Sequence, residues 1–204
     1  MSFRETALKL FCSTTSPYGR LVHIALLEKG IEFELAMVDP WADDAQLRVA
    51  NPATRVPTLR LDDGTVLTES LLILQWLERH RPRPSLFADA RVLERAGIAF
   101  GVIDAGAHTM ITRKVSASFD QSPIGQRRRR TMIEGLQRLE QAVLRDCAGR
   151  PAEAAGLDAI ATAVAQDYLR FRFGQEAWLT ATPALDAWLA QARLRPSYAS
   201  TQPR

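Results

Sequence analysis

Residues 8–29 read LKLFCSTTSPYGRLVHIALLEK, and this stretch decides the fold. Leu8 to Cys12 is a short apolar segment that runs into a cluster of turn-forming residues, which predicts a buried strand followed by a tight loop. Pro17 suits the first turn of a helix, because its missing N–H would have no partner there. Apolar residues at helical spacing continue to Lys29, and Gly30 predicts the end of the helix.

Further strands and helices follow this first strand and helix up to residue 80. Asp62-Asp63-Gly64-Thr65 separates two short apolar runs and is a strong hairpin signal. Ser70 is expected to be the N-cap of the last helix. The strands are predicted at 33–38, 58–61 and 66–68, and the helices at 41–50 and 70–80. The order strand–helix–strand–helix–strand–strand–helix is typical of a thioredoxin-like domain, because parallel strands need a crossover helix whereas a tight turn joins an antiparallel pair.

The strand signals end at a stiff polar linker, Arg81-Pro82-Arg83-Pro84-Ser85. Amphipathic helices are predicted beyond it at 89–118, 123–144, 157–173 and 183–194. Helices joined by short loops imply a bundle. The predicted fold class is therefore α/β followed by all-α. The chain is predicted to have an N-terminal thioredoxin-like domain (βαβαββα) at 1–80, a linker at 81–88 and a C-terminal helical bundle at 89–204.

Composition favours a globular protein, since the 204 residues are 47% hydrophobic and 24% charged. The net charge is +3, and the densest basic run is Arg127 to Arg130. In a nucleic-acid-binding protein this run would contact phosphates. No aromatic residues are interleaved with it, however, and the rotation of a helix sends its four side chains in different directions. We therefore expect a solvated helix face and no nucleic-acid partner.

The cysteine pattern and the N-terminus bear on the compartment of the protein. Cys12 and Cys147 show no paired spacing, which excludes a disulfide framework and a cysteine zinc site and fits a reducing compartment. The N-terminal residues lack the apolar core of a signal peptide, and no apolar run reaches the ~18 residues of a membrane span. We expect a cytoplasmic protein with no membrane partner, no metal and no cofactor.

The loop from Ser13 to Tyr18 is the first segment that could carry chemistry. A hydroxyl at the start of a helix meets unsatisfied N–H groups and the positive end of the helix dipole, which stabilise an anion. A thiol bound there would ionise more easily. Ser16 is therefore either a plain helix cap or the donor of a hydrogen bond to a thiolate.

Two further segments could bind a ligand. Val56-Pro57 precedes a strand and is a candidate cis peptide, which would leave the Val56 N–H and C=O free to pair with an extended ligand. An ordinary trans proline at a strand start is the alternative. Glu69-Ser70 opens a helix, so it is either a simple cap or a site for a carboxylate, with Glu69 accepting from an ammonium group.

The segments STTSPYGRLVHIALLEKGIEFE, NPATRVPTL and DDGTVLTESLLILQWLE together resemble the N-terminal domain of cytosolic glutathione S-transferases. The shared hallmarks are an S-P-Y/F turn opening the first helix, an N-P-x-x-x-V-P loop and an E-S pair opening the third helix. The resemblance covers about Leu8 to Pro84, and the helical remainder is similar in layout. The stretches IDAGAHTMITRK and YLRFRF are similar to an uncharacterised bacterial branch of the family.

The resemblance implies that glutathione is a co-substrate and that a serine stabilises its thiolate. Ser16 holds the place of the thiolate-binding hydroxyl in serine-type members. Ser13 is the alternative, because some branches use the earlier residue of this loop. Tyr18 is expected to lie beside the bound tripeptide and to line the second-substrate cleft.

The rest of the glutathione site is also implied by resemblance. Val56 would pair its backbone with the cysteinyl part of glutathione, beside a cis Pro57. Glu69 and Ser70 would bind the γ-glutamyl end. Arg55 holds a position where a basic or polar residue often meets the glycine carboxylate, a task that suits the forked guanidinium.

The chain departs from the family pattern at two places. Cysteine-type members carry a thiol in the active loop, whereas Cys12 precedes that loop, and we interpret it as part of the strand and the core. Many members also have a Ser/Thr-x-x-Asp capping box at the start of the buried helix near residue 157. The local sequence is Ala155-Gly156-Leu157-Asp158, so the box is not intact, although Asp158 remains a candidate cap.

The second substrate is expected in a cleft between the two domains, with Tyr18 on one side and the long helices on the other. Ile111 and Phe171 could instead belong to the core of the helical bundle. His108 could instead be a packed or solvated histidine without a catalytic role. Arg113 and Arg172 could bind an anionic substrate or be solvated. Asp104 could reach the glutathione amine in a partner subunit. The candidates are Asp104, His108, Ile111, Arg113, Tyr168, Phe171 and Arg172.

The function predicted from the resemblance is a glutathione S-transferase that activates glutathione as a thiolate for attack on a small electrophile. Two alternatives stay open on the same fold: a non-catalytic glutathione-binding or regulatory protein, and a glutathione-dependent disulfide or peroxide reductase. A homodimer is expected by resemblance, since the amphipathic helices do not by themselves distinguish burial within a subunit from burial between subunits.

Overall fold

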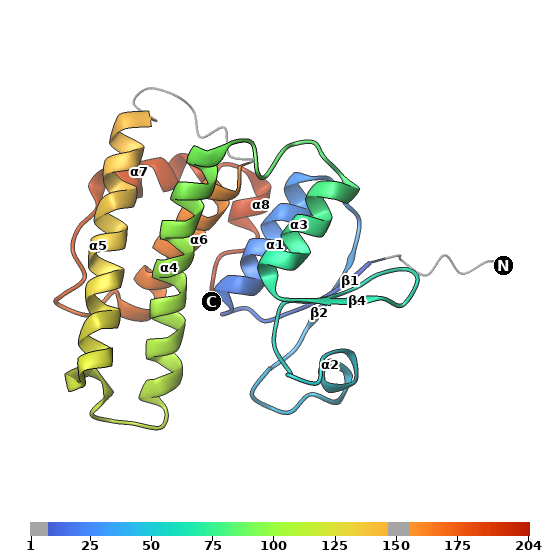
Figure 1. The fold of residues 1–204 in the computed structure, drawn as a ribbon, viewed down its shortest axis with the longest axis horizontal. Helices are drawn as coiled ribbons and strands as arrows, with labels where there is room; N and C mark the ends of the chain where they lie inside the picture. The colour runs from blue at the N-terminus through green and yellow to red at the C-terminus, as the bar shows by residue number, and fades with distance from the viewer. Residues whose placement is uncertain (1–7, 147–155) are drawn as a thin grey trace. The chain divides into compact units, whose positions relative to one another are not determined.

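The computed structural model describes residues 8–146 and 156–204 (Figure 1), so Cys147 and Ala155 lie outside the described residues. The chain divides into two compact units, one ending at Leu86 and including residues 200–204, and the other spanning Phe87–Ala199. The division falls inside the predicted linker. The grouping of the last five residues with the first unit was not predicted. It has a physical reason, since the buried Arg20 donates from Nε to Thr201 Oγ1 at 3.3 Å.

The first unit is built on a four-stranded mixed sheet. Its strand order is β2-β1-β3-β4, with β1 parallel to β2 and with β3 antiparallel to both β1 and β4. This arrangement confirms the predicted thioredoxin-like fold, including the hairpin between the last two strands. The strands are β1 (Lys9–Cys12), β2 (Glu34–Met37), β3 (Thr58–Arg60) and β4 (Val66–Thr68).

Helices cover both faces of this sheet. Figure 1 shows α1 (Pro17–Glu28) and α3 (Ser70–His80) side by side on one face and the short α2 (Ala45–Ala50) on the other. The helix α2 begins four residues later than predicted. Asp44 is its N-cap and accepts from Leu47 N at 2.9 Å, whereas Trp41 lies in a turn in which its N–H donates to Asp39 Oδ1.

The second unit is all-helical, as predicted, with α4 (Ala90–Arg113) packed against α5 (Pro123–Asp146) and α6 (Leu157–Phe173), followed by α7 (Pro183–Ala192). The predicted extension of α4 to Ser118 is wrong. The chain leaves the helix after Arg113 and forms the short 3-10 helix η1 (Phe119–Gln121), which buries Phe119. The short α8 (Pro196–Ala199) had no sequence signal. Within the described residues, no helix is both long and apolar enough to cross a membrane.

Two helices of the second unit begin without a cap from their own N-terminal residue. Gly156 precedes α6, and Asp158 does not cap it but binds Arg95 of α4, with Nε and Oδ2 2.7 Å apart. At α7 the side chain of Thr182 makes no cap hydrogen bond. Glu140 of α5 instead accepts from Ala184 N at 2.9 Å and Leu185 N at 2.7 Å. A carboxylate from the neighbouring α5 therefore satisfies the start of α7, whereas the carboxylate in the first turn of α6 binds an arginine of α4.

A buried lysine closes the end of the first unit. The Lys29 ammonium is fully buried and donates to Glu78 Oε2 at 2.8 Å and to the carbonyls of Arg81 and Pro84 at 2.6 and 2.8 Å. Burial acts to raise the pKa of Glu78, but hydrogen bonds from Lys29, Ser85 and Leu86 outweigh it and hold that pKa below its usual value. This cluster ties the end of α1 to the end of α3 and to the segment that follows it.

We predict that Lys29→Met lowers the free energy of unfolding by roughly 3 kcal/mol, because the Glu78 carboxylate loses its cationic partner and the carbonyls of Arg81 and Pro84 lose the donor that Lys29 supplies. Urea unfolding followed by circular dichroism measures this change. The exposed Arg130 of α5 provides the control Arg130→Met, which is expected to change stability by less than about 0.5 kcal/mol. Equal stability of the two variants would contradict a structural role for the Lys29 cluster.

Candidate functional site

The register of the sheet brings three loops of the first unit to one edge. Phe11 pairs with Thr58 across β1 and β3, and Thr58 pairs with Thr68 across β3 and β4. Because both pairs are antiparallel, the end of β1, the start of β3 and the end of β4 lie at the same end of the sheet. The loops that carry the predicted glutathione-site residues all join the sheet at this end. The sheet thus brings together segments that are up to 57 residues apart in the case of Ser13 and Ser70.

Ser16 lies between β1 and α1 and is the N-cap of that helix. Its Oγ accepts from Gly19 N at 3.1 Å, and Pro17 occupies the first helical position. A hydroxyl that accepts one hydrogen bond still has a proton to donate. Ser13 lies on the other side of the turn, where its carbonyl accepts from Ser16 N at 3.3 Å. Both serines are half-buried, and Tyr18 is half-buried in the first turn of α1.

Cys12 lies beneath this loop and belongs to the core, as interpreted from the sequence. It is 3% exposed at the end of β1, and burial raises the pKa of its thiol to about 11, against a smaller lowering by a hydrogen bond to Ser13. A Cβ added at Gly19 would lie 2.5 Å from the Cys12 sulfur. The glycine therefore lets the first turn of α1 approach β1. The Cys12 thiol is neutral and is shielded from solvent.

The loop before β3 contains the cis peptide Val56–Pro57, which confirms that interpretation. The buried Asn51 holds this loop, because its amide donates to Arg55 O at 3.2 Å and to Thr58 Oγ1 at 3.0 Å. Thr58 Oγ1 donates in turn to Arg55 O at 2.8 Å. In the part of the chain that the structure describes, the N–H and C=O of Val56 have no hydrogen-bond partner.

Asn51 and Thr58 are positioning residues that the sequence analysis did not assign to the site. The signal was present in the N-P-x-x-x-V-P motif, whose asparagine comes five residues before Val56. A buried side-chain amide needs hydrogen-bond partners, and its acceptors here are groups of Arg55 and Thr58, which flank Val56 and Pro57.

The start of α3 corrects the prediction for Ser70. The N-cap is Glu69, whose side chain makes no cap hydrogen bond, and Ser70 is the first helical residue. Glu69 has φ 65° and ψ 117°, in a region that non-glycine residues rarely occupy. Such an outlier persists only where its surroundings impose it, and outliers of this kind cluster at functional sites.

Two helix N-termini meet at this edge of the sheet, since α1 follows β1 and α3 follows β4. Each carries unsatisfied N–H groups and a partial positive charge. Arg55 adds a guanidinium, which lies 3.8 Å from the Glu69 carboxylate. Both side chains are more than half exposed, so this ion pair is weak and can open for a ligand. The edge therefore offers an acceptor, a cation and two anion-stabilising helix starts.

The candidate residues of the second unit fall into three groups, of which the first lies between α4 and α5. Asp104 Oδ2 accepts from Arg128 Nη1 at 3.2 Å, and His108 Nδ1 lies 3.0 Å from Arg128 Nη2. His108 Nε2 is 4.0 Å from Asp104 Oδ1. Arg128, from the basic run, thus pairs with α4. Asp104 and His108 are engaged within their own unit, and their proposed contact with substrate stays a prediction.

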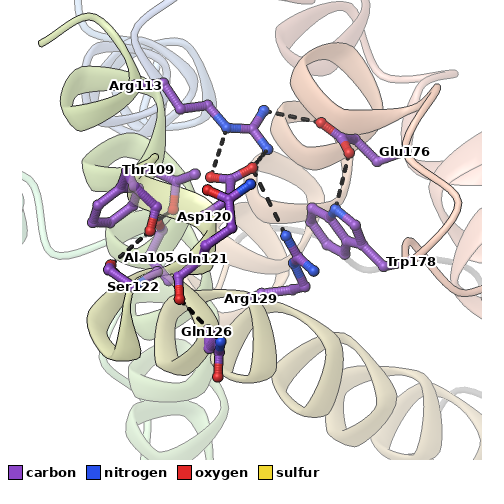
Figure 2. Close-up of polar contacts among 12 residues, drawn as sticks. Ala105, Thr109, Arg113, Asp120, Gln121, Ser122, Gln126, Arg129, Glu176 and Trp178 are labelled. Atoms are coloured by element: carbon purple, nitrogen blue, oxygen red, sulfur yellow. Dashed lines mark hydrogen bonds and ion pairs between the residues drawn. The ribbon is translucent and has the colours of Figure 1, made fainter. Parts of the chain in front are cut away.

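Arg113 belongs to the second group, a network of ion pairs and hydrogen bonds that Figure 2 shows. Its guanidinium donates to both oxygens of Asp120, at 3.0 and 2.5 Å, and to Glu176 at 2.9 Å. Asp120 also pairs with Arg129 at 3.8 Å, and Glu176 accepts from Trp178 Nε1 at 3.1 Å. Two carboxylates already neutralise Arg113, which favours a structural role, and its contact with an anionic substrate stays a prediction.

The third group lies on α6 and α4. Ile111 and Phe171 are 44% and 41% exposed, so their alternative interpretation as bundle core is wrong. Tyr168 is buried, and its ring lies against Gly106 of α4. Arg172 is half-buried, and its guanidinium carbon lies 4.6 Å from the centre of the Phe171 ring. Tyr168, Phe171 and Arg172 form an aromatic and cationic cluster without an internal carboxylate among the described residues.

Comparison with known proteins identifies clear relatives. The sequence profile of the glutathione S-transferase N-terminal domain matches residues 15–80. A glutathione S-transferase from Methylobacterium radiotolerans, solved with glutathione sulfonate, is 31% identical with a TM-score of 0.83 and is aligned over 96% of this chain and 94% of its own.

Two further relatives also match over nearly their whole length. A glutathione S-transferase from Methylobacillus flagellatus, solved with GSH bound, is 26% identical with a TM-score of 0.82, over 97% of this chain and 100% of its own. The uncharacterised GST-like protein YibF of Escherichia coli K12 is 29% identical over 201 residues, which are 96% of this chain and 98% of YibF.

We predict that Asn51→Ala destabilises the protein by about 1–3 kcal/mol, because the buried Thr58 hydroxyl loses its donor and the Arg55 carbonyl loses one of its two donors. Thermal and urea unfolding measure this change. Gln46→Ala provides a matched control, since Gln46 is an exposed amide on the neighbouring α2. If Asn51→Ala were as stable as Gln46→Ala, the amide would not hold the Val56 loop.

Proposed function

Because the chain belongs to the glutathione S-transferase superfamily, we propose that it is a transferase that binds glutathione on its first unit and activates it as a thiolate. The sulfur then attacks a small electrophile: a carbon–sulfur bond forms, the leaving group departs with its electron pair, and the thiol proton passes to solvent. The observation that carries the proposal is the convergence of three ligand-binding loops at one edge of the sheet.

Ser16 stabilises the glutathione thiolate in this proposal. Its Oγ already accepts from Gly19 N, so its proton is available for the sulfur. The sulfur would lie over the first turn of α1, where unpaired N–H groups and the helix dipole favour negative charge. These groups are in place before the thiol ionises, so little reorganisation is needed. Ser13 remains the alternative donor from the same loop.

The peptide part of glutathione pairs with Val56 in the manner of an added strand. Both backbone groups of Val56 lack a partner in the described residues, and Asn51 holds their orientation. A short extended peptide gains two hydrogen bonds there. Pro57, in its cis bond to Val56, ends this docking segment at the start of β3.

The charged ends of glutathione have matching partners at either side of this segment. Glu69 accepts from the γ-glutamyl ammonium group, and the start of α3 at Ser70 receives the γ-glutamyl carboxylate. The Ser70 hydroxyl has no hydrogen-bond partner among the described residues, which leaves it available for this carboxylate. Arg55, released from its loose pair with Glu69, binds the glycine carboxylate.

Cysteine chemistry at the loop after β1 is disfavoured, which supports the assignment to serine-type members. Cys12 is buried, and a thiol whose pKa is about 11 is neutral at physiological pH.

We also propose a homodimer, supported by the 44% and 57% exposure of Leu71 and Leu72 on α3. A cytoplasmic location stays a prediction from the sequence.

We predict that Ser16→Ala raises the apparent pKa of bound glutathione by about 1 to 2 pH units, because a hydrogen bond to a charged group contributes about 1.5–3 kcal/mol. Thiolate absorbance, followed against pH at saturating glutathione, measures this pKa. Ser16→Thr keeps both the helix cap and the hydroxyl, so it is expected to restore the wild-type value. A larger shift in Ser13→Ala than in Ser16→Ala would assign the role to Ser13 instead.

We further predict that the protein takes up glutathione in titration calorimetry and conjugates it to a chlorinated aromatic electrophile faster than it reduces a peroxide or a mixed disulfide. Faster reduction of the mixed disulfide would identify a reductase. Uptake of glutathione without turnover in any assay would favour a regulatory binding protein. No uptake of glutathione would contradict the proposed site altogether.

A further inference from the structure

Arg172 differs from the other partly buried arginines of the second unit in its charge balance. Most of those arginines form an ion pair with an aspartate or a glutamate: Arg95, Arg113, Arg128, Arg129 and Arg170. Arg172 forms no such pair within the described residues. A half-buried guanidinium is less well solvated than an exposed one, so its charge calls for a compensating anion.

Two aromatic rings lie beside this unbalanced charge. The guanidinium carbon of Arg172 lies 4.6 Å from the ring centre of Phe171 and 6.0 Å from that of Tyr168. The rings attract the cation but accept no ordinary hydrogen bond. Nε of Arg172 is buried and has no acceptor, which is unfavourable because a buried donor is left unsatisfied. An incoming carboxylate would supply both the missing charge and the missing acceptor.

Tyr168 adds a second donor beside the arginine. Burial raises the pKa of its phenol, and the charge of Arg172 and a hydrogen bond from it oppose this rise without cancelling it. The phenol is therefore protonated at neutral pH and can donate. Gly106 of α4 positions the ring, since a Cβ there would lie 3.1 Å from Tyr168 Cε1 and 2.9 Å from Leu169 Cδ2.

We propose that Arg172 and Tyr168 form a carboxylate-binding site on α6 and that the second substrate is an aromatic or apolar electrophile carrying a carboxylate. Phe171, which is 41% exposed beside the guanidinium, would contact the apolar body of this substrate. The proposal rests on the transferase function proposed above, because it names the class of electrophile that the same enzyme uses.

The chemistry of the site favours a carboxylate over a phosphate group. A guanidinium edge and a phenol provide two or three donors and one positive charge, which match a planar monoanion. A phosphate dianion would bring three oxygens and about two negative charges, and it would leave one of those charges unbalanced. Arg113, Arg128 and Arg170 cannot assist, because each is already paired with a carboxylate.

A pair of electrophiles that differ only in charge tests this proposal. A chlorodinitrobenzoate and the corresponding uncharged benzamide react alike with glutathione: the sulfur bonds to the ring carbon, chloride leaves with the electron pair of the carbon–chlorine bond, and the thiol proton passes to solvent. The rate of each reaction with glutathione alone is subtracted. The measured quantity is the ratio of kcat/KM for the benzoate to kcat/KM for the benzamide.

We predict that this ratio falls about 10- to 100-fold in Arg172→Met, because a charge-assisted hydrogen bond is lost. Tyr168→Phe is expected to lower the ratio by about 3- to 10-fold, since the ring and its packing remain while one neutral donor is lost. Arg130→Met removes the same charge from an exposed position on α5, so it should leave the ratio unchanged. An unaltered ratio in Arg172→Met would overturn the proposal and leave the transferase function intact.

A binding measurement separates the failure of this site from a failure of the transferase function. The unreactive dinitrobenzoate and dinitrobenzamide are titrated into the full chain in the presence of glutathione, and thermal unfolding checks that each variant is folded. Tighter binding of the benzoate to the wild type, with the preference lost in Arg172→Met, supports the site even if neither chlorinated probe turns over. Equal affinity for the two compounds, or a preference that survives in Arg172→Met, refutes it.

Discussion

The antiparallel pairing of β3 with both β1 and β4 is the constraint on which the candidate site depends. It places the end of β1, the start of β3 and the end of β4 at one edge of a four-stranded sheet. Three loops that lie far apart in the chain therefore meet without any loop having to be long. The starts of α1 and α3 come to the same edge, because each helix follows directly from one of these strands. Anion-stabilising backbone and ligand-pairing backbone are thus adjacent by topology alone.

Polar side chains then fix the loops while leaving ligand-binding groups available. Asn51 uses its buried amide to hold the Val56 loop, and Ser16 uses an oxygen lone pair, not its proton, to cap α1. In the second unit an arginine also holds segments together, since Arg113 joins α4, η1 and the segment before α7 through two carboxylates. Whether a charged residue is structural or can bind a ligand therefore depends on its partners. Arg113 is structural because its charge is balanced, and Arg172 is a ligand candidate because its charge is not.

Much of the fold and part of the site could be predicted from local sequence. The Pro17 helix start, the Asp62–Thr65 hairpin and the long helices depend on residues within a few positions of one another, so their signals survive in the sequence. Errors arose where distant residues decided the outcome. The helix α4 ends at Arg113, where that side chain binds Asp120 and Glu176, the latter 63 residues away. Asp158 binds Arg95 instead of capping α6 for the same kind of reason.

The sequence by itself determined the order of elements, the thioredoxin-like pattern and the family resemblance, because periodicity, turn residues and short motifs act over a few residues. Only the tertiary structure decided which polar groups remain available to a ligand. Whether Cys12 is a nucleophile or core, whether Val56 has a free backbone edge and whether Arg113 or Arg172 can meet an anion all depend on burial and on partners remote in the chain. Those quantities exist only after the chain has folded, since desolvation and ion pairing are properties of an environment and not of a residue.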